Sequence, residues 1–510
     1  MTTASAQRCS TLIELMSKGA DDAVAITAPG QAALTYGRLR KLVQETIASL
    51  NGFGIGRKDR VAIVLPNGPE MATAFIAIAS GATAAPLNPS YRADEFEFYM
   101  ADLSAKALVV EAGSTSPAVE MARKLGIRII TLTPMPAEGA GAFHLSAEGT
   151  GECLGGPAEP DETALILHTS GTTSRPKIVP LSQRNVSVSA GNIAATLELS
   201  AQDRGLNIMP LFHIHGLMAG VLAPLSQGGQ VFCTPGFNAL KFFGWMEECK
   251  PNWYTAVPTM HQAILTRAPN NRETIAKYPL RFMRSSSSSM PPQVITELEA
   301  TFHAPLIESY GMTEASHQMA SNPLHAVRKP GSVGLAAGPE VAIMDLDGKL
   351  LAHGETGEIV IRGANVTAGY EANPKANAEA FTHGWFRTGD QGVMDEDGYV
   401  SLTGRLKEII NRGGEKISPR EVDEVLMDHP AVRQAVVFAV KHDKLGEEVA
   451  AAIVLREGAS ASEADIRDFA AKRLAPYKVP RKILLLEQIP LGATGKLQRI
   501  GLAQKLGLEA

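Results

Sequence analysis

The sequence has few cysteines and no excess of charge of either sign. Its 510 residues include four cysteines, and they are too widely spaced for a C-x-x-C pair. Neither a zinc site nor a disulfide framework is therefore predicted, and a reducing compartment fits best. The formal net charge is -5, with Lys+Arg 48 against Asp+Glu 53. This balance provides no basic field for nucleic acid and no polybasic membrane patch, so neither partner is expected.

The chain also lacks a long uninterrupted apolar run. Its most apolar segment, residues 71–87, is broken by Gly81 and Pro86 and is too short to span a bilayer. We expect this segment to form a buried helix that leads into a strand. No signal peptide is recognised at the N-terminus and no peroxisomal tripeptide at the C-terminus, so the expected location is cytoplasmic.

What the sequence does contain is the pattern of a layered α/β protein. Short apolar runs such as RVAIVLP and EIVIRG alternate with helical patterns, and hydrophobic residues make up 45% of the chain. A chain of this length predicts at least two domains. Residues 134–160 are rich in Gly, Pro, Ala and Glu without periodicity, and we predict a surface loop there.

A domain boundary is predicted near residue 405. Ser418 is a good N-cap, Pro419 occupies the first helical position, and Glu421 would complete a capping box. The elements expected after this cap are a helix, strands at 435–440 and 449–455, a helix at 462–474 and a strand at 482–487. We therefore predict a large domain over residues 1–404 and a small α+β domain over residues 405–510.

Two polar segments follow expected strands, and each allows two interpretations. The segment HTSGTTSRPK, residues 168–177, presents hydroxyls, backbone N–H groups and Lys177, which together can cradle a phosphate. It lacks the Walker A pattern, and a Ser/Thr turn that caps a helix is equally compatible with it. The segment RSSSSSMPP, residues 284–292, is either a flexible linker or the lining of a site.

Five segments occur in one order along the chain. They are HTSGTTSRPK at 168–177, YGMTE at 310–314, RTGD at 387–390, GRLKEIINRGGEKISP at 404–419 and PLGATGK at 490–496. Each alone could be a turn, a solvated charge or a helix cap. As an ordered set they resemble the adenylate-forming superfamily of acyl-CoA synthetases, peptide-synthetase adenylation domains and beetle luciferases. The resemblance covers nearly the whole chain, and implies a large multi-layered N-terminal α/β domain with a small mobile C-terminal domain.

The resemblance implies ATP, magnesium (Mg2+) and coenzyme A as ligands, and it assigns roles to individual positions. Thr313 matches the contact to the α-phosphate, Glu314 the magnesium ligand, and Lys496 the lysine of the adenylation step. Tyr310 matches the aromatic residue that packs on adenine, and Asp390 the carboxylate that accepts both ribose hydroxyls. The other nucleotide- or CoA-binding positions that it implies are Thr169, Ser170, Gly171, Thr172, Thr173, Lys177, Ser287, Ser288, Ser309, Gly311, Arg405, Gly413 and Gly414.

Three further positions bear on how the resemblance applies. The family's usual Gly after the TSGTT segment is Ser174 here, so no role is assigned to that residue. Lys407 falls at the family's inter-domain hinge, and Gly413 and Gly414 fall where the small domain lines the pantetheine tunnel. The serine run matches a small-residue segment that passes adenine and borders the acyl pocket, which favours the site interpretation over the linker.

The reaction that the family implies has two steps, and the expected pocket suggests the acid. A carboxylate attacks the α-phosphate of ATP, and the CoA thiol then attacks the acyl adenylate. The acyl pocket would be polar, because His213, His317, Ser286 and Ser287 would line it. A polar pocket favours a second carboxylate on the substrate. His213 is also a catalytic candidate. The segments EFEFYM, WYTAVPTMHQ and MTEASHQMASNPL resemble oxalyl-CoA synthetases of plants and fungi. We therefore expect AMP-forming ligation of oxalate to CoA.

Other interpretations stay open at this point. His215 and His261 could be satisfied core residues, as a lone histidine more often is. The acid could be another short-chain or aromatic carboxylate. Loading of a carrier protein is less favoured, because only 14 residues follow Lys496. A nucleotide-binding scaffold without catalysis is opposed by the presence of Thr313, Glu314, Asp390 and Lys496.

Overall fold

The computed structural model describes residues 9–169, 176–490 and 498–508. The chain divides into two compact units. Unit 1 comprises Met1–Met290, Val294–Val341 and Ile361–Phe386, and unit 2 comprises Pro291–Gln293, Ala342–Val360 and Arg387–Ala510. The sequence-based boundary between residues 404 and 405 stays a prediction.

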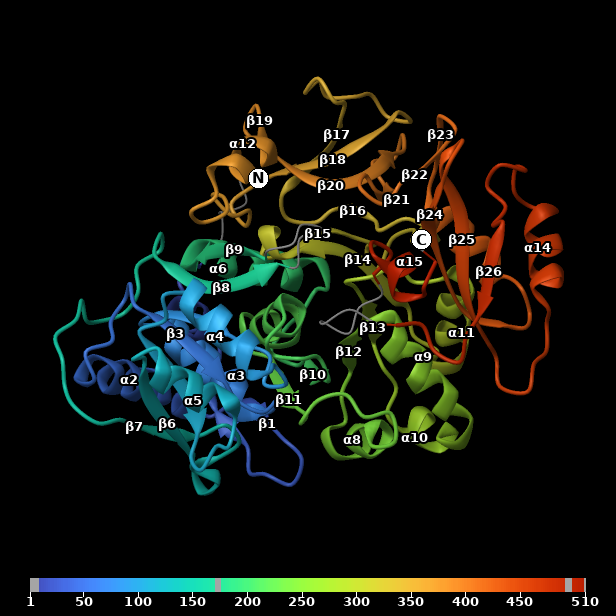
Figure 1. The fold of residues 1–510 in the computed structure, drawn as a ribbon. Coiled ribbons are helices and arrows are strands. Elements are labelled where there is room, and N and C mark those ends of the chain that lie inside the picture. The colour runs from blue at the N-terminus through green and yellow to red at the C-terminus, as the bar shows by residue number, and fades with distance from the viewer. Residues whose placement is uncertain (1–8, 170–175, 491–497, 509–510) are drawn as a thin grey trace, which may run out of the picture. The chain divides into compact units, whose positions relative to one another are not determined.

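The first sheet of unit 1 has seven strands in the order β7-β6-β5-β3-β4-β8-β9 (Figure 1). Its strands are β3 (Arg60–Val64), β4 (Thr83–Pro86), β5 (Ala107–Glu111), β6 (Arg128–Pro134), β7 (Phe143–Ser146), β8 (Thr163–Thr169) and β9 (Lys177–Ser182). The inner strands are parallel, and β7 and β9 close the two edges in antiparallel pairing. The loop predicted for residues 134–160 is therefore wrong in part, because Phe143 and Leu145 are buried and β7 pairs with β6.

The second sheet of unit 1 has nine strands in the order β16-β15-β14-β13-β12-β10-β11-β1-β2. Its strands are β1 (Val24–Thr27), β2 (Leu34–Thr35), β10 (Arg204–Asn207), β11 (Gln230–Cys233), β12 (Trp253–Ala256), β13 (Phe282–Ser285), β14 (Leu306–Met312), β15 (His317–Ser321) and β16 (Leu335–Ala336). Strands β12, β13 and β14 are parallel. Their carboxyl ends therefore meet at one edge, the usual place for a ligand in such a sheet.

Helices pack on these sheets. They are α1 (Leu12–Met16), α2 (Tyr36–Gly52), α3 (Pro69–Ala79), α4 (Ala93–Asp102), α5 (Pro117–Lys124), α6 (Gln183–Thr196), the π-helical η2 (Gly216–Leu222), α7 (Ala223–Leu225), α8 (Phe242–Cys249), α9 (Pro258–Arg267), α10 (Arg272–Lys277), α11 (Pro292–Phe302) and α12 (Pro374–Ala380), with short 3-10 turns η1 (Pro136–Glu138), η3 (Ala268–Asn270) and η4 (Thr313–Ala315). The buried helix expected within residues 71–87 is confirmed by α3, which leads into β4. No helix in the described part of the chain is long and apolar enough to cross a membrane.

A third sheet follows in the sequence. It contains β17 (Glu340–Met344), β18 (Thr356–Arg362), β19 (Phe381–Thr382), β20 (Trp385–Met394) and β21 (Val400–Arg405). The division between the units passes along β17, β18 and β20. No division inside these strands is predicted from the sequence.

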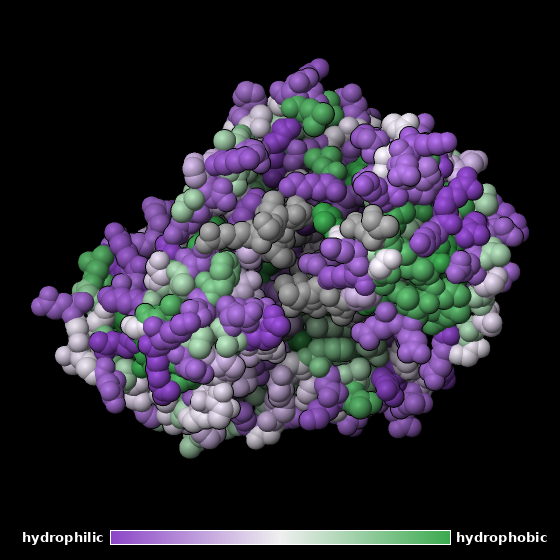
Figure 2. Space-filling view, in the orientation of Figure 1, coloured by the Kyte–Doolittle hydropathy of each residue, from purple (hydrophilic) through white to green (hydrophobic). Residues whose placement is uncertain are grey.

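The C-terminal part of unit 2 is the predicted small α+β arrangement. Its elements are β22 (Ile410–Arg412), β23 (Glu415–Ile417), α13 (Pro419–Met427), β24 (Val432–His442), β25 (Gly446–Leu455), α14 (Glu463–Ala471), β26 (Lys482–Leu485) and α15 (Leu502–Lys505). The expected order from α13 to β26 is confirmed, whereas β22, β23 and α15 were not predicted. Figure 2 shows hydrophobic residues gathered on the surface of this part of unit 2. Val436, Phe438 and Leu502 belong to one buried cluster of the same part.

Two sets of polar contacts hold this part together. Ser418 caps α13 by accepting a hydrogen bond from the N–H of Glu421 at 3.3 Å, while the carboxylate of Glu421 pairs with Lys478 at 2.6 Å. Arg499 forms one ion pair with Asp423 of α13 and another, 3.5 Å long, with Glu408. Burial raises the pKa of Asp423 to about 6, although the neighbouring Arg499 opposes that shift.

Candidate active site

The serine run begins inside the second sheet of unit 1. Ser285 is the last residue of β13, and both it and Ser286 have no exposed surface. The linker alternative is therefore wrong for these two residues, because a flexible connector would be solvated. Ser286 donates its hydroxyl hydrogen to the carbonyl of Ser309 on β14, over 2.9 Å. Ser287 is half-buried with φ +73°, and Ser288 is exposed.

Two histidines lie at this edge of the sheet. The Nδ1 atom of His215 is 3.0 Å from the hydroxyl of Ser287, and its ring stacks on His317 with the centroids 4.8 Å apart. Predicted substrate residues Ser287 and His317 are thus brought together through His215, which the sequence left open as a core residue. His213 is half-buried two positions earlier, beside Phe212. His261 is a core residue, and burial lowers its pKa to about 4.

An arginine that the sequence analysis missed lies beneath these histidines. Arg284 of β13 has no exposed surface. One guanidinium nitrogen lies 3.2 Å from His215 Nε2, and the other lies 3.2 Å from the side-chain oxygen of Gln318. Burial lowers the pKa of Arg284 to about 9, which leaves the side chain charged at neutral pH. The available signal was an arginine in a strand expected to be buried, directly before the serines.

Glu314 and Lys177 approach each other through a residue that no motif indicated. The hydroxyl of Tyr370 donates to Glu314 Oε1 over 2.8 Å, and Lys177 Nζ lies 4.2 Å from the centre of the Tyr370 ring. The Glu314 side chain is buried, and its backbone carbonyl accepts from Thr367 N–H at 2.7 Å. A carboxylate oriented by a hydroxyl suits magnesium, a hard cation bound by one or two carboxylates together with substrate phosphates. The residues present therefore fit the ion.

The neighbouring predicted residues lie on β14 and just after it. Ser309, Tyr310 and Gly311 belong to β14, and Thr313 begins the η4 turn. A Cβ atom at Gly311 would lie 1.8 Å from the carbonyl oxygen of His317, so only glycine allows β14 and β15 to approach here. This contact fixes His317 close to the strand that carries Tyr310.

A half-buried His–Asp pair lies at the start of the proposed phosphate loop. Thr169 is the last residue of β8, opposite Lys177 in the antiparallel pairing with β9. The preceding His168 lies 3.1 Å from Asp102 of α4, and burial lowers the pKa of His168. The predicted loop residues Ser170, Gly171, Thr172 and Thr173 lie outside the described residues, as do Ser174 and the predicted catalytic Lys496.

The remaining predicted residues belong to unit 2. Asp390 of β20 and Arg405 of β21 are directly opposite in the sheet, and their side chains form an ion pair of 3.1 Å. Asp390 is buried, whereas Arg405 is about half exposed. Gly413 and Gly414 form the turn between β22 and β23 with φ of +59° and +96°, a backbone that favours glycine.

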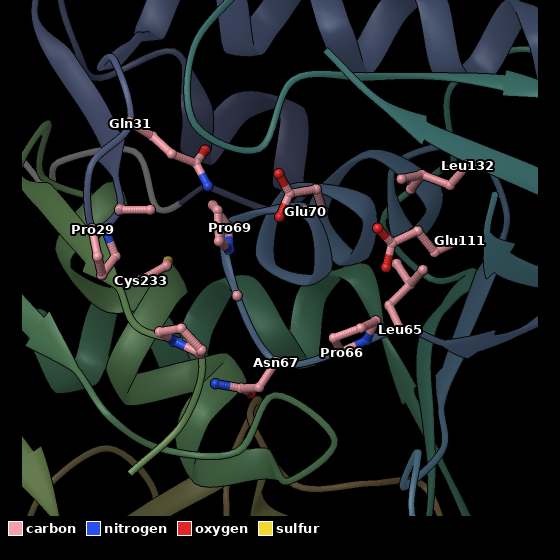
Figure 3. Close-up of a pocket in the computed structure, with 13 residues that line it drawn as sticks. Pro29, Gln31, Leu65, Pro66, Asn67, Pro69, Glu70, Glu111, Leu132 and Cys233 are labelled. Atoms are coloured by element: carbon pink, nitrogen blue, oxygen red, sulfur yellow. The ribbon is translucent and has the colours of Figure 1, made fainter. Parts of the chain in front are cut away.

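A separate cavity lies in unit 1, and none of the predicted site residues lines it. It has a volume of about 170 Å³, and Figure 3 shows Glu70 and Glu111 on its wall with Cys233 nearby. Burial raises the pKa of Glu70. An acidic wall repels a carboxylate substrate, so this cavity does not suit the acid of the expected reaction.

Comparisons with known proteins agree with this geometry. The chain matches the model of the AMP-binding enzyme family over residues 15–371 and that of the AMP-binding enzyme C-terminal domain over residues 421–496. The chain belongs to the AMP-binding enzymes. It is an acyl-CoA ligase of the adenylate-forming superfamily, and the predicted α/β fold with its large N-terminal and smaller C-terminal part is confirmed.

Relatives of this AMP-binding enzyme align over nearly its whole length. A probable CoA ligase, CCL9, of Humulus lupulus is 47% identical, over 96% of this chain and 95% of its own. An oxalate–CoA ligase of Arabidopsis thaliana is 45% identical, over 97% of both chains.

Two solved structures extend the comparison. ATP-bound MatB from Rhodopseudomonas palustris has a TM-score of 0.86 and 28% identity, covering 97% of this chain and 98% of that one. MenE from Bacillus subtilis in complex with ATP and magnesium has a TM-score of 0.81 and 28% identity, covering 96% and 99%. ATP and magnesium are thus seen in solved relatives of this AMP-binding enzyme.

Proposed function

We propose that this AMP-forming acid–thiol ligase activates oxalate and transfers the oxalyl group to coenzyme A. The observation that carries the proposal is the cluster of His215, His317, Ser287 and the buried Arg284 at the carboxyl ends of the β12–β14 strands. Hydrogen-bond donors and a positive charge suit a second carboxylate, whereas a fatty acid would require apolar walls. The 45% identity to an oxalate–CoA ligase supports the same substrate.

In the first step, one oxalate oxygen attacks the α-phosphate of ATP, and pyrophosphate leaves. We assign Thr313 to the α-phosphate, and Lys177 with residues 169–173 to the remaining phosphates. Lys496 would stabilise the negative charge that gathers on the phosphoryl oxygens. Loss of one such group costs roughly 3–4 kcal/mol of transition-state stabilisation.

Further residues are assigned to the nucleotide. Tyr310 would pack against adenine next to Ser309, Gly311 and the serine run at Ser287 and Ser288. Asp390 would accept the two ribose hydroxyls, with Arg405 as the second ribose contact. Glu314, oriented by Tyr370, would hold magnesium, which when bound neutralises phosphate charge.

In the second step, the thiol of CoA attacks the acyl carbon of oxalyl adenylate, and AMP leaves. The two steps need different groups near the reacting carbon, and rotation of a small domain about a hinge can supply both sets in turn. We assign the hinge to Lys407 and the path of the pantetheine arm to Gly413 and Gly414. We place the domain boundary at residues 404 and 405 for the same reason.

The second carboxylate of oxalate would be held by His213 or His317, with a hydroxyl from Ser286 or Ser287. Ser286 already donates to the carbonyl of Ser309, so its hydroxyl oxygen rather than its hydrogen faces any further partner. Ser287 is therefore the stronger donor of the two. The alternative substrate is another short-chain or aromatic acid, which would leave the charged cluster without a counter-charge.

The decisive experiment is an acid panel with ATP, magnesium and CoA. Oxalate, oxamate, malonate, acetate and cinnamate would be compared by thioester mass and by AMP release. We expect oxalyl-CoA to form with the highest kcat/KM, because only a compact dianion places a carboxylate at the cluster. A reaction without CoA controls for adenylate formation alone. Preference for acetate or cinnamate would overturn the oxalate assignment and leave the ligase class intact.

A further inference from the structure

The unusual feature of this site is a fully buried positive charge. Arg284 lies in the middle of the nine-stranded sheet, and its side chain contacts His215, Thr255 and Gln318. These partners are all neutral side chains or side chains that can be neutral. Across the described residues, no aspartate or glutamate forms an ion pair with Arg284. Burying an uncompensated charge is costly, so its presence calls for a functional explanation.

The arginine fixes the protonation of His215. A guanidinium can only donate hydrogen bonds, and one of its nitrogens lies 3.2 Å from His215 Nε2. His215 Nε2 must therefore accept this hydrogen bond. The Thr255 hydroxyl lies 2.6 Å from the same His215 nitrogen and can donate a second hydrogen bond to it. A proton on Nε2 is excluded, so the ring is neutral and carries its proton on Nδ1.

This tautomer in turn sets the direction of the Ser287 hydroxyl. Because Nδ1 carries the proton, it donates to Ser287 Oγ across the 3.0 Å contact. The Ser287 hydroxyl hydrogen is then directed to another acceptor. Ser287 is held for this purpose in a backbone conformation, φ +73°, that a residue with a side chain rarely adopts.

We propose that Arg284 is a positioning residue that makes the enzyme select a dianionic acid. It acts through His215 to present Ser287 as a hydrogen-bond donor, and its charge supplies the positive potential that the second carboxylate needs. This inference rests on the proposed oxalate activity and names the residue that gives that activity its specificity. The counter-charge that Arg284 lacks in the protein is thus brought by the substrate.

A stability consequence separates this role from a purely structural one. Removing a buried ion that has no counter-ion also removes the cost of burying it, whereas removing one member of a buried pair leaves the other charge uncompensated and destabilises. Arg284→Met should therefore leave the melting temperature unchanged or raise it. Arg281→Met is the matched control, because Arg281 pairs at 2.9 Å with Asp203, whose side chain is 3% exposed. This control should lower the melting temperature by several degrees and leave acid selectivity intact.

The selectivity test uses oxalate and oxamate, in which a neutral amide replaces one carboxylate. Arg284→Met should lower kcat/KM for oxalate by roughly tenfold to a hundredfold, mainly through KM, and should change that for oxamate little. KM for ATP should stay constant. Arg284→Lys retains the charge and should keep more of the oxalate preference than Arg284→Met.

A double variant tests whether the charge acts through the serine. Ser287→Ala should reduce the preference for oxalate over oxamate. The double variant Ser287→Ala with Arg284→Met should lose no more of this preference than the more damaging single variant, because both substitutions interrupt the same contacts from Arg284 through His215 to Ser287. Fully additive losses would overturn the route through His215.

Each result has a defined meaning. An unchanged ratio of oxalate to oxamate in Arg284→Met would overturn the inference while the oxalate activity stands. Equal losses for both acids with a lowered melting temperature would also overturn it, because Arg284 would then be structural. A wild-type enzyme that does not use oxalate would overturn the proposed function first and this inference with it.

Discussion

Replacing Tyr370 with phenylalanine removes one oxygen atom and tests how Glu314 is oriented. The hydroxyl of Tyr370 donates to Glu314 Oε1 over 2.8 Å, and the Glu314 side chain is buried. Without this donor, the Glu314 carboxylate is no longer held in one orientation by the Tyr370 hydroxyl. We expect the half-saturating concentration of magnesium for adenylate formation to rise.

The size of this effect follows from the contact. A hydrogen bond to a charged group contributes roughly 1.5–3 kcal/mol, which corresponds to about a tenfold to hundredfold change in an equilibrium constant. Loss of a group that orients a metal ligand typically costs 10–100-fold in affinity or activity, in agreement with that range. The aromatic ring stays in place, so Lys177, which lies 4.2 Å from its centre, should keep its position.

The assay is pyrophosphate release at varied magnesium and fixed ATP and oxalate. Thermal unfolding with ATP, in the presence and absence of magnesium, gives an independent measure of binding. Tyr36→Phe is the control, because its buried hydroxyl donates to the Gly229 carbonyl over 2.6 Å, and the same atom is removed. The control should lose stability and keep its magnesium dependence. An unchanged magnesium dependence in Tyr370→Phe would refute the assignment of Glu314.

Three other predictions concern the remaining assignments. Lys496→Ala should abolish adenylate formation yet still form thioester from supplied oxalyl adenylate, and equal losses in both half-reactions would contradict the domain rotation. Lys407→Pro fixes φ at about -65°. It should preserve one half-reaction while the other falls sharply, and unchanged overall turnover would mean that the hinge lies elsewhere. His317→Ala should raise KM for oxalate roughly tenfold or more but leave KM for a small monocarboxylate nearly unchanged, as steady-state kinetics on both acids will test.

Local patterns made much of the fold predictable and indicated the candidate site residues, because the residues of each pattern are close in sequence. The buried helix α3 followed from an apolar run ended by glycine and proline, and the cap of α13 from Ser418. The strand β7 was missed, because an edge strand with alternating burial within a Gly-rich segment has little periodic signal.

Residues that act through long-range contacts could not be predicted from the sequence. Tyr370 is 56 positions from Glu314, and Arg284 is 69 positions from His215. Neither Tyr370 nor Arg284 lies in one of the five ordered segments, and their proposed roles depend on which strands become neighbours. Sheet pairing is a property of the whole chain, so a local pattern cannot reveal such partners.

The two ion pairs of Arg499 have a further consequence for Lys496, the lysine proposed for the adenylation step. Arg499 is tied to Asp423 and Glu408 within unit 2, and Lys496 precedes it by three residues. A chain of that length spans at most about 11 Å, so the two Cα atoms cannot separate further. On the proposed assignment, Lys496 is tethered to Arg499, and its effective concentration at the phosphate depends on the position of that arginine.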